Sequence, residues 1–172
     1  MKAYLCCLLL PLGMISAQPL PALRTLQIDT SPKPIEGTLY VPPDRVDALC
    51  IMIPGSGPVR RDGRLLGAKG GKPVYAEMAV HLAKRGIATF LYDKRWVRYL
   101  EYAHTFTEED HLADLTAIVD GLKKEIVCNR VILLGHSEGG SLAVVLAGRR
   151  HDISGTIVAA SAGFPIDELL LE

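Results

Sequence analysis

The chain has 172 residues, of which 49% are hydrophobic and 22% charged, a composition typical of a folded globular domain and not of a disordered chain. Its 19 basic and 19 acidic residues give a formal net charge of zero. This balance excludes a general electrostatic affinity for nucleic acid or anionic membranes and favours a small neutral ligand.

The N-terminal residues differ in kind from the rest of the sequence. Lys2 precedes an apolar run over residues 4–15, and Ala17 then supplies a small residue before a cleavage point. The run is too short to span a bilayer as a helix, so residues 1–17 predict a secretory signal peptide. We expect a periplasmic or secreted protein with no membrane span after signal removal. The alternative for this segment is a buried N-terminal strand or helix.

Removal of the signal would leave Cys50 and Cys128 in an oxidising compartment. Each lies near the start of an apolar run, and the sequence leaves open whether their Cα atoms come within bridging distance. We expect two free, buried cysteines.

Strand and helix patterns alternate after the signal. Two short strands over 23–29 and 35–41, joined by a proline-containing turn, come first. Apolar runs of strand length and segments of helical spacing then follow: strands at 48–53, 87–92, 131–134 and 153–160, and helices at 75–85, 112–122 and 141–147. Thr107 and Asp110 have the form of a capping box before the second helix, and Gly86 is placed to end the first. The alternation predicts an α/β fold: a mostly parallel sheet with helices on both faces and an N-terminal strand pair.

The segments at the carboxyl ends of the strands are where ligands bind in such sheets. The strand at 48–53 ends in a glycine loop that contains Gly55, Ser56 and Gly57. The strand at 87–92 ends in Asp93 and Arg95, which we expect to brace the strand end as a hydrogen-bonded pair.

The strand at 131–134 ends in Gly135-His136-Ser137-Glu138-Gly139, which has the form G-x-S-x-G. A serine that turns sharply from a strand into a helix needs almost no side chain two positions before and after it, and Gly135 and Gly139 meet this need. The sequence therefore predicts a nucleophile elbow at Ser137, with a purely structural turn as the alternative.

Acyl transfer needs a nucleophile, a base and donors for the oxyanion of the tetrahedral intermediate. Ser137 is the candidate nucleophile, and the backbone N–H of Glu138 at the start of a helix is one candidate donor. The glycine loop supplies the second donor from Ser56 or Gly57, unless the loop is a plain turn. The glycines match no nucleotide motif and the His and Cys spacing matches no metal site, so we expect no cofactor and no metal.

The histidines do not supply an evident base. His151 closes the helix after Ser137, roughly 15 to 20 Å from the serine. His136 lies inside the elbow and points away from Ser137, while His81 and His111 are expected to be solvated helix residues. His104 lies in a flexible segment on the active-site side and is the remaining candidate.

These motifs together resemble the α/β-hydrolase fold family, in particular its bacterial secreted or periplasmic esterase-like and serine-aminopeptidase-like members. The resemblance is carried by residues 53–58 with Asp62 and Gly63, and by residues 82–87, 92–95 and 135–140. It implies Ser137 as nucleophile, Ser56 and Glu138 as backbone oxyanion donors, and a small-molecule acyl substrate. Family members carry an acid and then a histidine after the elbow. The resemblance thus implies that residues 18–172 are the N-terminal part of an incomplete, C-terminally truncated α/β-hydrolase domain.

We therefore expect a serine hydrolase of acyl compounds, with carboxylic esters favoured over peptides or thioesters, whose present chain is nearly inactive by itself. The sequence departs from the family's usual pattern at Trp96-Val97-Arg98-Tyr99, where family members usually have a glycine turn. The competing hypothesis is a catalytically dead fragment or a non-catalytic binding domain, which could self-associate through the exposed edge of its last strand.

Overall fold

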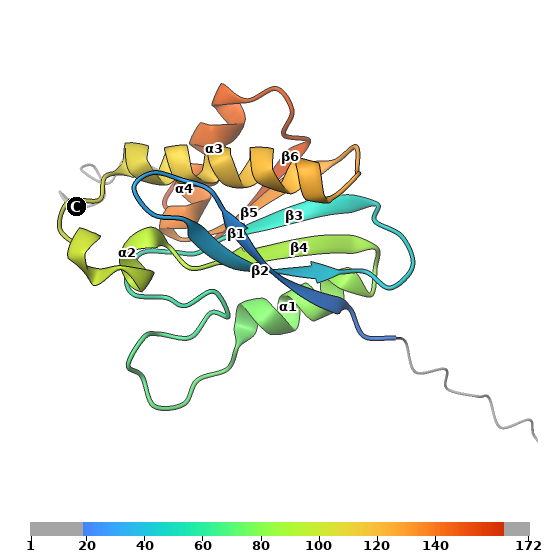
Figure 1. Ribbon diagram of the computed structural model, residues 1–172, viewed down its shortest axis with the longest axis horizontal. Helices are drawn as coiled ribbons and strands as arrows, with labels where there is room; N and C mark the ends of the chain where they lie inside the picture. The colour runs from blue at the N-terminus through green and yellow to red at the C-terminus, as the bar shows by residue number, and fades with distance from the viewer. Residues whose placement is uncertain (1–18, 164–172) are drawn as a thin grey trace, which may run out of the picture.

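The computed structural model describes residues 19–163 (Figure 1). The predicted signal peptide over residues 1–17 lies outside the described residues. Within them, six strands form one sheet in the order β1-β2-β4-β3-β5-β6. The strands are β1 (Ala22–Ile28), β2 (Ile35–Val41), β3 (Ala48–Ile53), β4 (Ile87–Tyr92), β5 (Val131–His136) and β6 (Gly155–Ala159). The pairs β1·β2 and β2·β4 are antiparallel, and the pairs that join β4, β3, β5 and β6 are parallel. The expected mostly parallel sheet with an N-terminal strand pair is confirmed.

Helices cover both faces of this sheet, as the alternation predicts. In Figure 1, α3 and α4 lie on one face and α1 lies on the other. The helical segments are α1 (Val74–Ala83), α2 (Arg95–Arg98), the 3₁₀ turn η1 (Leu100–Tyr102), α3 (Glu108–Glu125) and α4 (Glu138–Arg149). The predicted capping box at the start of α3 is present, because Thr107 and Asp110 exchange hydrogen bonds. Within residues 19–163, every helix is either too short or too polar to cross a membrane.

The side chains of β3 explain why its sequence is apolar at every position. Leu49, Ile51 and Ile53 pack into the core under α3 and α4, whereas Cys50 and Met52 pack with residues of α1 on the other face. Alternate residues of a strand point to opposite faces, so a strand covered on both sides must be apolar throughout. The buried β3 thus carries the glycine loop on a rigid support.

The two cysteines of the described residues are both free, as expected. Cys50 is fully buried and Cys128 is partly buried. Burial raises the pKa of the Cys50 thiol to about 12, so this thiol stays protonated and unreactive near neutral pH.

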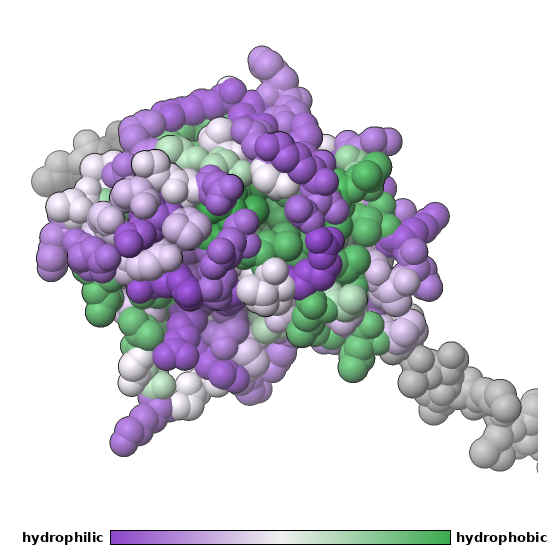
Figure 2. Space-filling model, viewed as in Figure 1, coloured by the Kyte–Doolittle hydropathy of each residue, from purple (hydrophilic) through white to green (hydrophobic). Residues whose placement is uncertain are grey.

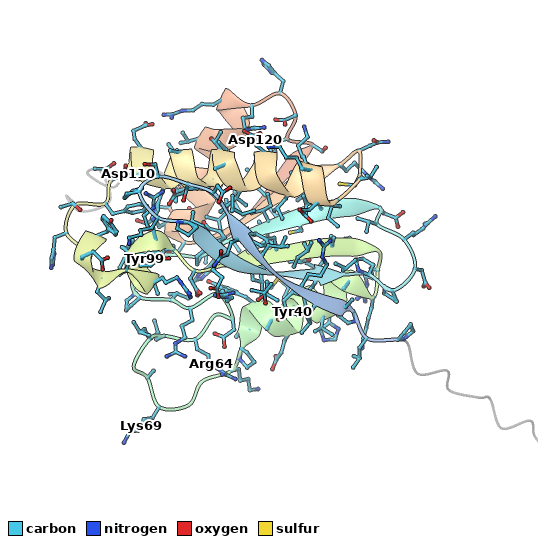
Figure 3. All side chains as sticks on the ribbon, in the orientation of Figure 1. Tyr40, Arg64, Lys69, Tyr99, Asp110 and Asp120 are labelled. Carbon is cyan, nitrogen blue, oxygen red and sulfur yellow. The ribbon has the colours of Figure 1, made fainter. Side chains whose placement is uncertain are left out.

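Exposed hydrophobic residues lie at both edges of the sheet. Figure 2 shows hydrophobic surface among hydrophilic residues on the side where β1 and β2 lie, and Leu23 at the start of β1 is 62% exposed. The segment between β3 and α1 carries Arg64 and Lys69 away from the sheet (Figure 3). At the opposite edge, Ile157 and Val158 of β6 are about half exposed.

Candidate active site

Ser137 is the single residue between the end of β5 and the start of α4. Its backbone has φ 53° and ψ −124°, a conformation that residues other than glycine rarely adopt. The backbone N–H of Ser137 donates to the carbonyl of Ala159 in β6 at 2.9 Å, which holds the turn against the neighbouring strand. This is the strained strand-to-helix turn that a nucleophile elbow requires.

The two glycines of the motif are in direct contact with backbone atoms. A Cβ on Gly135 would lie 2.1 Å from the carbonyl oxygen of Gly139, and a Cβ on Gly139 would lie 2.3 Å from that of Ile53. Both positions therefore require glycine because α4 packs closely against the ends of β5 and β3.

The glycine loop after β3 lies against the elbow. A Cβ on Gly55 would be 3.0 Å from the Cβ of Ser137, so the loop and the serine are in close contact. Gly57 has φ 80°, a left-handed conformation that favours glycine, and Ser56 is exposed between the two glycines. The fold thus brings together the loop that carries Ser56 and the helix start that carries Glu138, the two candidate oxyanion donors.

Tyr75 in α1 connects the elbow to this loop, and sequence reasoning missed it. Its buried hydroxyl is 3.0 Å from Nδ1 of His136. Burial raises the pKa of the Tyr75 hydroxyl, and a hydrogen bond from the backbone of Gly55 opposes this rise. The imidazole of His136 therefore contacts Tyr75, and this contact does not involve Ser137.

Lys94, which follows β4, is the second residue that sequence reasoning missed. Its side chain is 1% exposed, and its Nζ donates to the carbonyl oxygen of Gly55 at 2.5 Å. The same Nζ lies 3.7 Å from the carboxylate of Glu138 and 4.8 Å from the centre of the Trp96 ring. Burial lowers the pKa of Lys94, and the Glu138 carboxylate opposes this effect.

The hydrogen bond from Lys94 fixes the orientation of a peptide group. In a trans peptide, the C=O of Gly55 and the N–H of Ser56 point in opposite directions. Because Lys94 holds the carbonyl on one side, the N–H of Ser56 is directed to the other. Lys94 thus contacts both segments that carry the candidate oxyanion donors.

The expected hydrogen-bonded pair of Asp93 and Arg95 is wrong. Asp93 instead accepts hydrogen bonds from the backbone N–H of Arg61 at 2.9 Å and from its Nε at 2.8 Å. Arg95 begins α2, where the chain turns away from β4, and its buried guanidinium pairs with Asp114 of α3. Arg61 therefore anchors the glycine loop to the end of β4, and Arg95 anchors α2 to α3.

His111 was expected to be solvated, and this expectation is also wrong. The residue is 7% exposed, because the segment before α3 folds over the first turn of the helix. Its ring packs edge to face on Phe106, with centres 4.5 Å apart. Burial, together with repulsion from Lys94, lowers the pKa of His111 to about 4. The imidazole is therefore neutral near neutral pH.

This lowered pKa makes stability depend on pH. As pH falls from 6.5 towards 4, the unfolded chain binds a proton at His111 that the folded chain does not, so the free energy of unfolding falls. His111 should lower the free energy of unfolding of the original chain by about 3 kcal/mol over this range. We expect His111→Phe not to show this part of the decrease. Urea unfolding of both proteins at pH about 7 and about 4.5 measures the difference. Equal acid sensitivity of the two proteins would contradict the lowered pKa.

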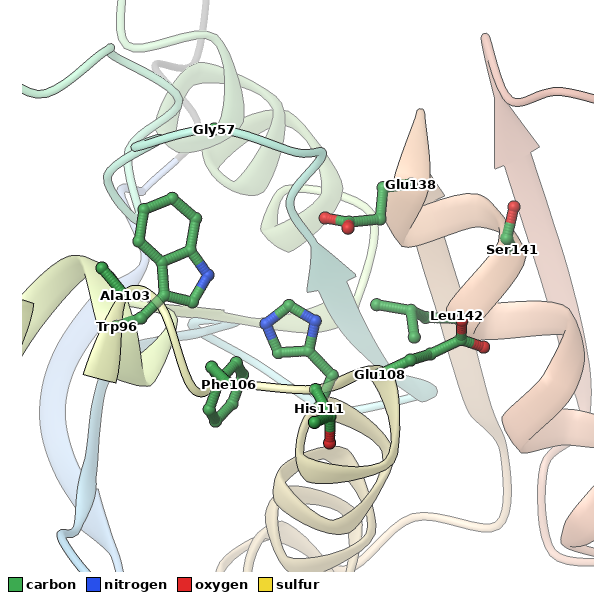
Figure 4. A pocket seen from close by; sticks show the side chains of 10 residues that line it. Gly57, Trp96, Ala103, Phe106, Glu108, His111, Glu138, Ser141 and Leu142 are labelled. Atoms are coloured by element: carbon green, nitrogen blue, oxygen red, sulfur yellow. The ribbon is translucent and has the colours of Figure 1, made fainter. Parts of the chain in front are cut away.

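A cavity of about 250 Å³ lies next to the glycine loop and the start of α4 (Figure 4). Gly57, Trp96, Phe106, His111, Glu138 and Leu142 are among the residues that line it. The described residues contain no cluster of His, Cys, Asp or Glu that could hold a metal ion. His104 is exposed beyond η1, and His151 follows the far end of α4.

The sheet order, the helices on both faces and the strained serine turn define an α/β hydrolase. The family model described as serine aminopeptidase, S33, matches residues 72–169, which is more than half of the chain. The chain therefore belongs to the α/β-hydrolase family, as its motifs indicated.

Several known proteins are similar to this chain. Esterase EstD of Thermotoga maritima is 27% identical over 121 residues, which cover 70% of this chain and 28% of that esterase. The α/β hydrolase GrgF of Penicillium sp. sh18 matches with a TM-score of 0.64 and 19% identity, over 81% of this chain and 46% of the other. A dienelactone hydrolase of Anabaena variabilis matches with a TM-score of 0.66 and 17% identity, over 82% and 64%. These structural likenesses show the fold, and the chain spans less than two thirds of each of these proteins.

Proposed function

We propose that this chain is part of a serine hydrolase that cleaves acyl compounds, with carboxylic esters as the favoured substrates. The observation that carries the proposal is the strained backbone of Ser137 directly beside the Gly55 loop. A serine in this conformation projects its hydroxyl from a sharp turn, and the adjacent backbone N–H groups of Ser56 and Glu138 can stabilise an oxyanion. The membership in a hydrolase family and the similarity to an esterase support the same function.

In the proposed reaction, Oγ of Ser137 attacks the carbonyl carbon of the ester while a base takes the hydroxyl proton. The tetrahedral intermediate then expels the alcohol, which leaves with a proton, and water hydrolyses the acyl-enzyme. We propose that the acid and the histidine of the triad are supplied by sequence beyond the present 172 residues. Without them, Ser137 keeps its binding and oxyanion groups but reacts slowly.

Labelling with a fluorophosphonate tests this function. We expect the purified chain to label slowly at Ser137 and to label much faster when free imidazole is added, because imidazole can replace a missing histidine base. Intact mass and peptide mapping measure the rate and the site. Weak hydrolysis of p-nitrophenyl acetate should respond to imidazole in the same way.

Matched variants make the labelling test specific. Ser137→Ala should abolish both the slow and the imidazole-assisted labelling, whereas Ser161→Ala, which changes a serine on the loop after β6, should leave both unchanged. Labelling that survives in Ser137→Ala would overturn the proposal. Rapid labelling without imidazole would contradict the missing base and point to His104 or to a partner.

The substrate class is part of the same proposal. Esters are favoured over thioesters and peptides because the similar curated protein is named an esterase. Imidazole-assisted turnover of a matched acetyl ester, acetyl thioester and acetyl anilide would rank the three classes. Faster cleavage of the anilide would replace the ester proposal with a peptidase.

Two further proposals concern the setting of the protein. We propose export to the periplasm or the medium with cleavage after Ala17, so that the exported chain begins at Gln18 in an intact-mass measurement.

The half-exposed Ile157 and Val158 at the edge of the sheet favour the second candidate function, a binding domain that self-associates through β6. A strictly monomeric chain in sedimentation would rule out that association.

A further inference from the structure

The cavity beside the elbow lies between the two candidate oxyanion donors and the start of α3. Gly57, which follows Ser56, forms one part of its wall, and Glu138 forms another. Trp96, Phe106 and Leu142 supply the apolar part of the lining. An ester whose carbonyl oxygen bound the proposed oxyanion donors would therefore have this cavity directly beside it.

His111 is the polar group of this cavity that lacks a partner. In Figure 4 its ring projects from the start of α3, between Trp96 and Phe106 on one side and Glu138 and Leu142 on the other. Its Nε2 is buried and has no hydrogen-bond partner among the described residues. An unpartnered buried nitrogen costs free energy, so a ligand that hydrogen-bonds it gains more than a ligand that does not.

The size and charge of the cavity restrict the ligand. Its volume of about 250 Å³ exceeds the roughly 150 Å³ of an engineered apolar cavity that binds benzene, so one aromatic ring with a short substituent fits. The carboxylates of Glu108 and Glu138 line the cavity and would repel an anion. Edge and face contacts with Trp96 and Phe106 favour a flat ring over an aliphatic chain.

The chemistry of the imidazole selects the substituent. A neutral imidazole has one N–H donor and one acceptor nitrogen, and a hydroxyl can both donate and accept. A hydroxyl therefore satisfies Nε2 in either tautomer of His111. We propose that the cavity is a subsite for a neutral acyl group with a single aromatic ring and a hydroxyl, and that His111 binds this hydroxyl. The assignment of the cavity to the acyl group of the substrate rests on the proposed hydrolase function. Binding of a phenolic ester in the cavity does not depend on that function.

Trp96 provides the measurement, because it is the one tryptophan in the sequence and lines the cavity. We expect methyl para-hydroxybenzoate to change Trp96 fluorescence on binding and to bind about tenfold more tightly than methyl benzoate. The para-hydroxybenzoate anion should bind more weakly than its methyl ester. His111→Phe should abolish the preference for the hydroxyl but keep the binding of methyl benzoate.

Control variants separate the possible outcomes. His111→Gln keeps a donor and an acceptor and should retain part of the preference, and His81→Phe, at an exposed position of α1, should change nothing. Ser137→Ala should bind both esters as the original chain does. No fluorescence change, or a preference that persists in His111→Phe, would overturn the subsite while leaving Ser137 labelling unaffected. Binding with the expected preference but without Ser137 labelling would retain the phenolic binding site and reject the hydrolase.

Discussion

Lys94→Met is expected to slow the imidazole-assisted labelling of Ser137 by about two orders of magnitude, the typical effect of losing one oxyanion donor. Lys94 Nζ holds the Gly55 carbonyl at 2.5 Å and thereby directs the N–H of Ser56. Methionine fills a similar volume without the hydrogen bond, so the peptide group becomes free to rotate. The fold should persist, because methionine has a similar length and the Glu138 carboxylate that loses Lys94 is 44% exposed to solvent.

The concentration dependence of labelling distinguishes positioning from a general loss of structure. The maximal rate constant of labelling should fall, while the reagent concentration that gives half of this rate should change little. Lys72→Met, which changes an exposed lysine before α1, is the matched control and should label as the original chain does. An unchanged maximal rate in Lys94→Met would show that the orientation of the Gly55 peptide does not depend on Lys94.

Gly139→Ala should have the largest effect on stability, a loss of about 3 kcal/mol in the free energy of unfolding. The added Cβ would lie 2.3 Å from the carbonyl oxygen of Ile53 and 2.8 Å from that of Pro54. Both neighbours are backbone atoms at the end of the buried strand β3, so they cannot move aside as a flexible side chain would. Urea unfolding measures the change.

Gly148→Ala is the control, because Gly148 lies in the same helix and a Cβ there meets no atom within 4 Å. Alanine is a better helix former than glycine, so this variant should be more stable by roughly 0.5 to 1 kcal/mol. Opposite signs for the two alanines in one helix would show that contact, and not helix propensity, decides the outcome. Equal stabilities would mean that α4 can shift away from β3.

The sheet could be predicted from the sequence because its signals are local. The apolar runs at β3 and β4 and the strand pair before them have the period and length of strands, and β2, β3 and β4 begin and end where predicted. The turn at Ser137 could be predicted from Gly135 and Gly139, which lie two positions before and after it. These features depend on neighbouring residues, which the sequence displays directly.

The partners of the site residues could not be predicted in this way, because they are distant in sequence. Asp93 meets Arg61 and Lys94 meets Gly55 through the packing of loops, which no local pattern encodes. The burial of His111 did have a local signal. His111 lies four residues before Leu115 and seven before Ile118, on the apolar face of α3. A polar residue on such a face indicates either a buried contact or a site.

The backbone of Ser137 has a consequence for how this sequence could change over time. A non-glycine residue held at such φ and ψ values costs on the order of 1 to 3 kcal/mol, and glycine would relieve this strain. A lineage in which the chain served only as a scaffold or binding module would thus gain stability from Ser137→Gly, reached by a single codon change. Selection for stability would favour that replacement, and a need for the hydroxyl would oppose it. A serine kept in this strained conformation is therefore what the proposed hydrolase function predicts.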